Sequence, residues 1–95
     1  MVITANMVRW EISKILIDLG SSTDLIFAGT FDQMKLSRSQ LQPSESPLIG
    51  FGGKEFHALG KVSLLVSFGH SGNARTKYTT FDVVDLHYPY NAIFG

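Results

Sequence analysis

The chain has 95 residues, with eight acidic and eight basic residues, a formal net charge of zero at pH 7 and no cysteine. This length fits one domain with a single core, and the balanced charge excludes a strongly basic surface for nucleic acid or an anionic membrane. The lack of cysteine excludes a disulfide framework and thiolate zinc sites.

The apolar segments and the two ends of the chain bear on where the protein resides. The apolar runs fall far short of the roughly 20 residues that a membrane span needs, and the N-terminus lacks the basic start and long apolar segment of a signal peptide. We therefore expect an intracellular, cytoplasmic protein with no membrane partner and no nucleic-acid partner. Because the chain opens inside the apolar stretch MVIT and stops at NAIFG without a polar tail, we also expect a piece of a longer polyprotein, truncated after its Ile-Phe-Gly motif.

The first third of the chain is dominated by short strands. Val2–Met7 and residues 11–18 are rich in Val and Ile, which predicts two strands. A polar break around Arg9 predicts the hairpin turn between them. Leu25–Phe27 predicts a third, shorter strand.

One short helix and a surface connection follow. Phe27, Phe31 and Met34 recur at positions i, i+4 and i+7 with polar residues between them, which predicts a helix. Residues 37–46 are polar and contain Pro43, so they predict a connection on the surface.

The second half of the chain returns to strands. Strand-like segments flank GFGG at residues 50–53, and further strands are predicted at residues 61–68 and 78–84 with a loop at residues 69–73. Many strands, one short helix and glycine-bearing turns together predict an all-β fold. We expect a small closed or nearly closed β-barrel formed by one domain, residues 1–95.

Asp18 ends an apolar strand and is the main candidate for a functional acid. A carboxylate in that position is poorly solvated unless hydrogen-bond donors or a shared proton stabilise it. Gly20 lets the backbone turn close to the acid, and the hydroxyls of Ser21 and Ser22 can reach its oxygens. The segment predicts a cradle for one acid. The alternative from these residues alone is an aspartate that caps an ordinary turn.

Two further segments are candidates for function. GFGG predicts a hairpin tip almost free of side chains, suited to lie across an extended peptide, with Phe51 as its one large contact. Glycine-rich hairpins also occur for structural reasons alone. Near the end of the chain, Ile93 and Phe94 are followed by Gly95, an apolar pair that can pack closely beneath a glycine-containing turn.

In this order, the three segments resemble the retropepsin family, the aspartic proteases of retroviruses and retrotransposons. The family's acid motif matches Leu16, Ile17, Asp18, Gly20 and Ser21, its flap glycines match Gly50, Gly52 and Gly53, and its second apolar-apolar-glycine motif matches Ile93, Phe94 and Gly95. The stretches PLIGFGG, ALGKVSLLVSFG and YNAIFG are most similar to the protease region of plant gypsy-type LTR retrotransposon polyproteins.

The resemblance implies a barrel of the acid-protease type and an aspartic endopeptidase that cleaves a retroelement polyprotein without a metal or cofactor. Each of two chains would supply Asp18, one carboxylate taking a proton from water while the other donates one to the scissile carbonyl oxygen. The sequence also requires a homodimer for this chemistry, because no other aspartate is followed by x-Gly-Ser. Two such carboxylates about 3 Å apart share one proton, an effect for which aspartic proteases are the standard illustration, and this implies activity at acidic pH.

Two departures from the family leave a second hypothesis open. Leu19 stands where the family has Thr or Ser, whose hydroxyl bonds across the dimer axis. The family also continues beyond Gly95 with a helix and a terminal strand that builds the intersubunit sheet. We therefore expect weak or absent dimerisation of this chain. The alternative function is a degenerate or truncated barrel without activity, acting as a folding or interaction module.

The remaining polar and aromatic candidates carry little chemistry. The three histidines show no metal-ligand spacing, and the acids and histidine within residues 82–87 are better explained as surface residues, so no metal site is predicted. Trp10, Tyr88 and Tyr90 could line a groove. The alternative is that they are packing residues, which is the usual role of a single Trp near a turn.

Overall fold

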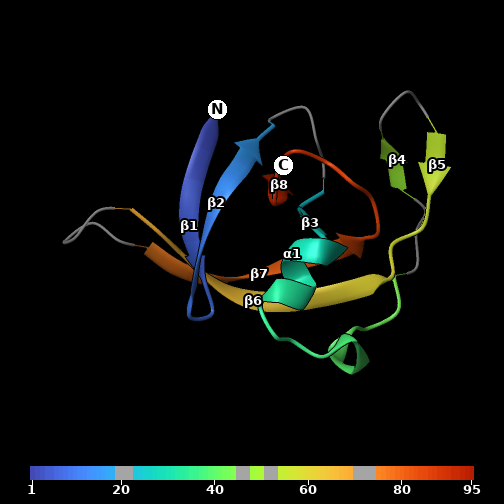
Figure 1. Ribbon diagram of the computed structural model, residues 1–95, viewed down its shortest axis with the longest axis horizontal. Coiled ribbons are helices and arrows are strands. Elements are labelled where there is room, and N and C mark those ends of the chain that lie inside the picture. The colour runs from blue at the N-terminus through green and yellow to red at the C-terminus, as the bar shows by residue number, and fades with distance from the viewer. Residues whose placement is uncertain (19–22, 45–47, 51–53, 70–74) are drawn as a thin grey trace.

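The computed structural model describes residues 1–18, 23–44, 48–50, 54–69 and 75–95, of which residues 48–50 and 54–56 are described by their backbone alone. This part of the chain is mostly β-structure, with one short α-helix and one turn of 3-10 helix (Figure 1). The elements in chain order are β1 (Val2–Met7), β2 (Trp10–Ile17), β3 (Leu25–Phe27), α1 (Ala28–Gln33), η1 (Arg38–Gln40), β4 (Leu48–Gly50), β5 (Lys54–Phe56), β6 (Gly60–Phe68), β7 (Arg75–Val84) and β8 (Ala92–Phe94).

Six strands form a closed barrel in the order β1-β2-β8-β3-β7-β6, which confirms the predicted barrel with one short helix. The last strand, β8, lies between β2 and β3. It runs parallel to β2, with Ile15 opposite Ala92 and Ile17 opposite Phe94, and antiparallel to β3. β3 in turn runs parallel to β7. The barrel is therefore closed by pairings between segments far apart in the sequence.

The predicted hairpin between β1 and β2 turns through Val8 and Arg9, since Met7 pairs with Trp10. The turn depends on Val8 taking a φ of 60°, a backbone conformation that glycine adopts more easily than a β-branched residue. Farther along β2 the register shifts, and Lys14 there has a φ of 54°. This irregularity is a β-bulge, which turns the backbone of β2 locally out of the ladder.

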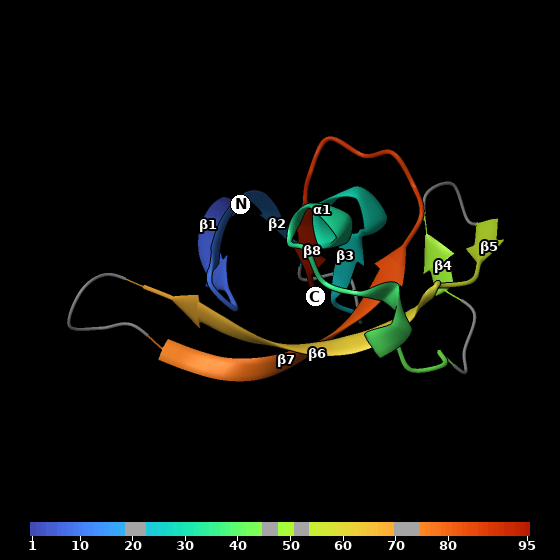
Figure 2. The ribbon, with the colours of Figure 1, turned by 60° about the horizontal axis from the view of Figure 1, so that its bottom comes forward.

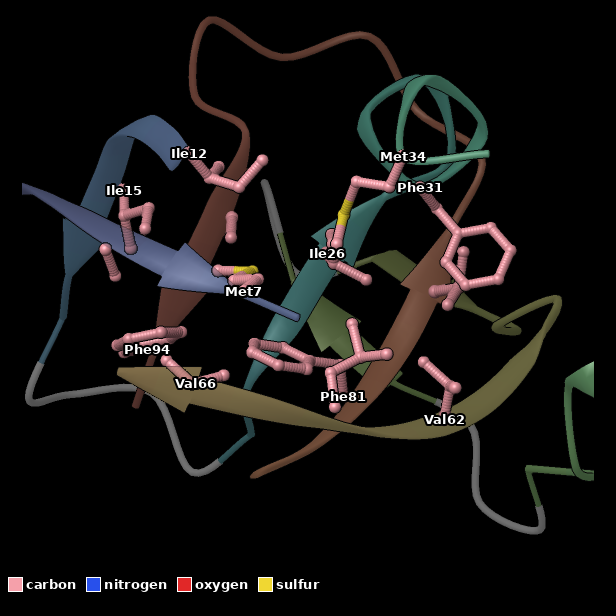
Figure 3. Packing of buried hydrophobic residues seen from close by; sticks show 14 of the residues in the cluster. Met7, Ile12, Ile15, Ile26, Phe31, Met34, Val62, Val66, Phe81 and Phe94 are labelled. Carbon is pink, nitrogen blue, oxygen red and sulfur yellow. The ribbon is translucent and has the colours of Figure 1, made fainter. Parts of the chain in front are cut away.

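The core fills the inside of the barrel with side chains from all its walls (Figure 3). Along β6, Val62, Leu64 and Val66 are buried while the residues between them are exposed, as expected for a strand with one face on the core. Phe31 of α1 and Met34, the residue that caps its C-terminal end, are both buried in this core, as the spacing that predicted the helix implies. Neither helix in the described part of the chain has the length and apolar character that crossing a membrane requires.

β6 and β7 form a long twisted ribbon that extends past the rest of the barrel (Figure 2). β7 begins at Arg75, earlier than the predicted residue 78, because its first residues pair with β6 although they carry no apolar alternation. The predicted surface connection contains η1 and a bridge from Gln42 to Lys61. Here Gly60 has no room for a side chain, since a Cβ atom would lie 2.7 Å from the Cβ of Leu41.

Thr79 is expected to be a weak point of the core. It is 9% exposed on the inward face of β7, and its hydroxyl has no hydrogen-bond partner among the described residues. Thr79→Val keeps the shape and removes a buried hydroxyl, so it should raise the free energy of unfolding by about 1 kcal/mol in chemical denaturation. The matched control is Thr80→Val, because the exposed Thr80 hydroxyl lies 2.8 Å from that of Ser63 and its loss should change stability little. Lower stability of the Thr79 variant would contradict the burial argument.

Candidate functional site

Asp18 lies immediately after β2, at the edge of the barrel wall. Its backbone N–H donates to the carbonyl of Phe94 at 2.9 Å, which extends the parallel pairing of β2 with β8 by one residue. On the other side of β2, the N–H of Ile17 donates to the carbonyl of Met1 at 2.8 Å. The backbone that presents Asp18 is therefore held from both sides.

The surroundings of Asp18 differ from the poorly solvated position that its sequence context predicts. Asp18 is exposed in the single chain. The physical reason is that β2 is buried on one face only: Ile12 and Ile15 are buried, whereas Leu16 and Ile17 are half-buried at the end that leads to the acid. The prediction of a buried carboxylate is wrong for one chain alone.

β8 lies directly beside Asp18 and is fixed on both of its faces. Phe94 points into the barrel, where its ring meets Phe68 edge-on with centroids 5.3 Å apart. Ile93 points to the outside of the wall. The N–H of Gly95 donates to a carboxylate oxygen of Asp24 at 2.9 Å. The chain thus places the three residues of the predicted apolar-apolar-glycine motif alongside the acid.

A second apolar cluster covers the outside of the wall next to Asp18. It consists of the buried residues Leu25, Phe27, Val84 and Ile93, with Leu16 and Ala58 packed against them. Leu16 is directly opposite Ile93 in the register of β2 and β8. Because side chains alternate along a strand, Leu16 and Asp18 project from the same face of the wall. The acid therefore borders a mostly buried apolar cluster outside the barrel core, of which Leu16 is the half-buried edge.

The two strands that flank the predicted glycine-rich tip pair with each other as a separate two-stranded sheet. β4 and β5 pair antiparallel, from Leu48 opposite Phe56 to Gly50 opposite Lys54. Figure 1 shows this hairpin standing apart from the barrel, toward the same upper side of the view as the end of β2. Gly50 is the last residue of β4.

Several residues named as candidates lie outside the described part of the chain. They are Leu19, Gly20, Ser21 and Ser22 after the acid and Phe51, Gly52 and Gly53 at the hairpin tip. Their roles stay predictions. Among the residues that the structure does describe, no group of three side chains is placed to hold a metal ion.

Asn91, which the sequence analysis did not single out, joins four elements around the base of β8. Its side-chain amide donates to the carbonyl of Ser13 at 2.7 Å and accepts from the hydroxyl of Thr30 at 2.9 Å. Its backbone N–H donates to the carbonyl of Lys14 at 2.9 Å and its carbonyl accepts from the N–H of Phe27 at 3.2 Å. Asn91 thus satisfies the two carbonyls that the bulge in β2 turns out of the ladder. In the sequence, the one sign of this role is that the polar Asn91 directly precedes the apolar strand β8.

A hollow of about 330 Å³ lies on another part of the surface, between α1 and the segment that joins β7 to β8. Tyr88 and Tyr90 line it, whereas Trp10 does not. At its edge, the Nε and Nη2 atoms of Arg38 donate to the two carboxylate oxygens of Asp32 at 3.1 and 2.8 Å. The hydrogen bond from Arg38 lowers the pKa of Asp32, so this pair stabilises the fold above the ordinary Asp pKa and ceases to do so as the pH falls through the lowered value. Both side chains are exposed, which keeps the effect small.

Comparison of the chain with known protein families, with curated proteins and with solved structures finds no match.

Proposed function

We propose that the chain is one subunit of an aspartic endopeptidase of the retropepsin type, which cleaves a retroelement polyprotein as a homodimer. The observation that carries this proposal is the placement of Asp18: it directly follows β2, its backbone N–H is bonded to β8, and it borders the outer apolar cluster. An acid that is exposed and held on paired strands can reach the backbone of an extended polypeptide. The separate β4–β5 hairpin supplies an element that can close over such a substrate.

The proposed chemistry needs a second copy of the chain. Three of the other four aspartates have structural partners: Asp24 accepts from Gly95, Asp32 from Arg38, and Asp82 from the hydroxyl of Ser44 at 2.9 Å. The fourth, Asp85, lines the hollow beside α1, which Asp18 does not line. A second copy would bring its own Asp18 to the site, and the pair would share one proton. The ionised carboxylate takes a proton from the attacking water while its protonated partner donates one to the carbonyl oxygen. Water is the nucleophile and the two carboxylates activate it, so the proposed mechanism calls for no metal or cofactor.

Dimer formation would also account for the exposure of Asp18 in the single chain. Contact with a second copy would remove water from the carboxylate, which disfavours its charged form. Leu16, the half-buried member of the outer cluster on the same face as Asp18, would offer an apolar contact to substrate side chains. We therefore expect cleavage between apolar residues of an extended polypeptide.

The test is hydrolysis of an unfolded polypeptide at about pH 5, where a shared-proton dyad is active. While most of the protein is monomeric, the concentration of dimer rises with the square of the chain concentration. The rate per chain should therefore rise with chain concentration, and pepstatin, which binds aspartic proteases, should stop the reaction. A rate per chain that stays constant where sedimentation shows monomer would contradict a site shared by two chains.

A second candidate function is a folding or interaction module without peptidase activity. It is favoured by the closure of the barrel, which buries a complete core within one chain. The same assay separates the two candidates. A chain that is folded and dimeric by sedimentation but cleaves nothing across acidic pH would support the inactive module.

A further inference from the structure

The first part of β7 has an open edge. On one side, residues 75–83 of β7 pair with β6, whereas on the other side β3 pairs only with residues 82–84. No described residue forms a backbone hydrogen bond with residues 75–80 on that second side. Figure 2 shows this part of β7 along the lower border of the β6–β7 ribbon. The ribbon therefore ends in a strand edge that can accept a further strand.

Two hydrogen bonds establish which backbone groups of β7 point to this open edge. The N–H of Asp82 donates to the carbonyl of Asp24 at 3.0 Å, on the side away from β6. Leu65 of β6, directly opposite Tyr78, turns its carbonyl away from β7 and accepts at 2.7 Å from the N–H of the residue after β1. In an antiparallel pair, residues alternate between bonding to the partner strand and pointing away from it. The N–H and C=O groups of Thr76 and Tyr78 therefore point to the open edge.

These backbone groups are held in place for a further strand. The two N–H and two C=O groups have no backbone partner among the described residues. On the outer face of the ribbon, the hydroxyls of Ser63 and Thr80 lie 2.8 Å apart and those of Ser67 and Thr76 lie 2.9 Å apart. These contacts join β6 to β7 on both sides of Tyr78. An extended polypeptide antiparallel to β7 would meet an edge that is already formed, and it would bond to all four groups.

The side chains along the edge determine which polypeptide fits. Arg75 and Lys77 are exposed, and neither makes an ion pair with a described residue. Residues 63–68 of β6 and 75–81 of β7 contain no acidic residue, so this end of the ribbon is positively charged. A second copy that paired through its own β7 edge would bring the positive charges of two ribbons together, and like charges on facing strands are destabilising. The charge therefore favours an acidic partner over a second copy.

We propose that the open edge of β7 binds an acidic, extended segment of another polypeptide, which adds a strand to the ribbon. Side chains alternate along a strand, so Arg75 and Lys77 project on one face and Tyr78 on the other. Acidic residues opposite Arg75 and Lys77 would pair with their charges. On the other face, Tyr78 is 74% exposed and lies opposite Leu65, which is 39% exposed. An apolar residue of the added strand would extend this row, so the preferred segment alternates acidic residues with apolar or β-branched ones.

The β7 edge is separate from the proposed peptidase chemistry. Asp18 follows β2, which pairs with β1 and β8 and not with β7. Binding of a peptide to β7 can be measured by NMR in the absence of any cleavage. The two proposals can therefore fail independently.

The experiment is a titration of the isotope-labelled chain with acetyl-Val-Val-Glu-Thr-Glu-amide. In the antiparallel register, its second Val is opposite Tyr78 and its two Glu residues are opposite Lys77 and Arg75. A short peptide on an exposed edge should give a dissociation constant on the order of millimolar. We expect saturable amide shifts at residues 75–79 and slower hydrogen exchange at the amides of Thr76 and Tyr78. The same peptide with Gln in place of both Glu residues should bind about fivefold more weakly.

Two N-methylated forms of the peptide, identical in composition, test the backbone pairing. Methylation of the second Val removes the N–H that faces Tyr78 and should abolish the saturable shifts. Methylation of the first Glu changes an N–H that faces away from β7, so it should weaken binding by less than about threefold. The comparison uses the unaltered chain and does not depend on the folding of a variant.

A pair of variants at Tyr78 tests the same edge from the side of the protein. Tyr78→Pro removes the central N–H, which points away from β6, so the β6–β7 pairing should persist while peptide binding is abolished. The matched control Tyr78→Thr keeps the N–H and a β-branched side chain, and it should bind within about threefold of the unaltered chain. Asp18→Asn should leave binding unchanged.

Three results would overturn the proposal. One is equal binding of the Glu and Gln peptides, or of the two N-methylated peptides. Another is the absence of saturable shifts in the folded chain, which would show that Arg75 and Lys77 serve to keep the edge unpaired. The third is hydrogen exchange at Thr76 and Tyr78 that slows with chain concentration without peptide, which would show a second copy on this edge.

Discussion

Asp18→Asn is expected to abolish peptide hydrolysis while leaving the fold intact. In the proposed dyad an amide can neither take a proton from water nor share one with its partner, and loss of general acid-base catalysis alone costs about 10²–10⁴-fold in rate. Because both subunits of a homodimer lose their carboxylate, the remaining activity should fall below detection. The fold should persist, since the side chain is exposed and its backbone N–H still bonds to Phe94. Circular dichroism checks the fold and cleavage of an unfolded polypeptide checks the activity.

The control for this prediction is Asp32→Asn, an exposed acid on α1 that has no part in the proposed chemistry. It should leave the rate of cleavage unchanged. A mixing experiment tests the shared site directly. Adding the Asp18 variant to a fixed amount of the unaltered chain should lower its activity, because mixed dimers hold one carboxylate. Full activity in the Asp18 variant itself would remove this residue from the mechanism.

Asn91→Leu is expected to be the most destabilising of the substitutions considered. It leaves the carbonyl of Ser13 and the hydroxyl of Thr30 without their side-chain partner. Net hydrogen-bond contributions of about 1 kcal/mol each, together with the cost of unpaired polar groups, predict a loss of about 2–4 kcal/mol in the free energy of unfolding. For a domain of this size that corresponds to roughly 10–20 °C in the melting temperature. Chemical denaturation measures the loss.

Two companion variants sharpen the Asn91 prediction. Asn6→Leu changes an exposed asparagine of β1 and should alter stability by less than about 0.5 kcal/mol. Asn91→Asp keeps the acceptor for Thr30 but turns a second oxygen toward the carbonyl of Ser13. Only its protonated form can donate to that carbonyl, so folding should raise its pKa. The variant should then be most stable at acidic pH and lose stability as the pH rises through that raised pKa. A destabilisation that does not depend on pH would show that the contact with Ser13 contributes little.

Local apolar patterns were enough to predict most of the elements. β1 and β3 have the bounds that their runs of apolar residues predict, and the spacing of Phe31 and Met34 correctly predicts α1. These signals are local, because a strand or helix that buries one face has apolar residues at a regular spacing within its own sequence. The first residues of β7 were missed for the same reason. They are ordered by pairing with β6 and carry no apolar pattern of their own.

Local patterns could not predict which strands pair or which distant residues form hydrogen bonds. Asn91 bonds to Ser13 and Thr30, which lie 78 and 61 positions away in the sequence, and no local pattern links them. The placement of β8 between β2 and β3 likewise depends on pairing between distant segments that no local pattern links. For the candidate site, the motif residues around Asp18 and β8 were named from the sequence. The exposure of Asp18 could not be predicted, because it depends on which face of β2 the rest of the barrel covers. The hollow beside α1 could not be predicted either, because it depends on the path of the segment from β7 to β8 past α1.

The position of β8 also determines when the barrel can form. β2 and β3 are neighbours in the sequence, yet in the barrel each of them pairs with β8. Until residues 92–94 have been synthesised, the growing chain can make the β1–β2 and β6–β7 hairpins but cannot join β2 to β3. Contacts between distant segments pay a large loop-closure entropy before they add stability, so this step should be late and slow. A nascent chain halted before residue 92 should expose its apolar strands and depend on chaperones, whereas one extended past residue 95 should be able to close the barrel.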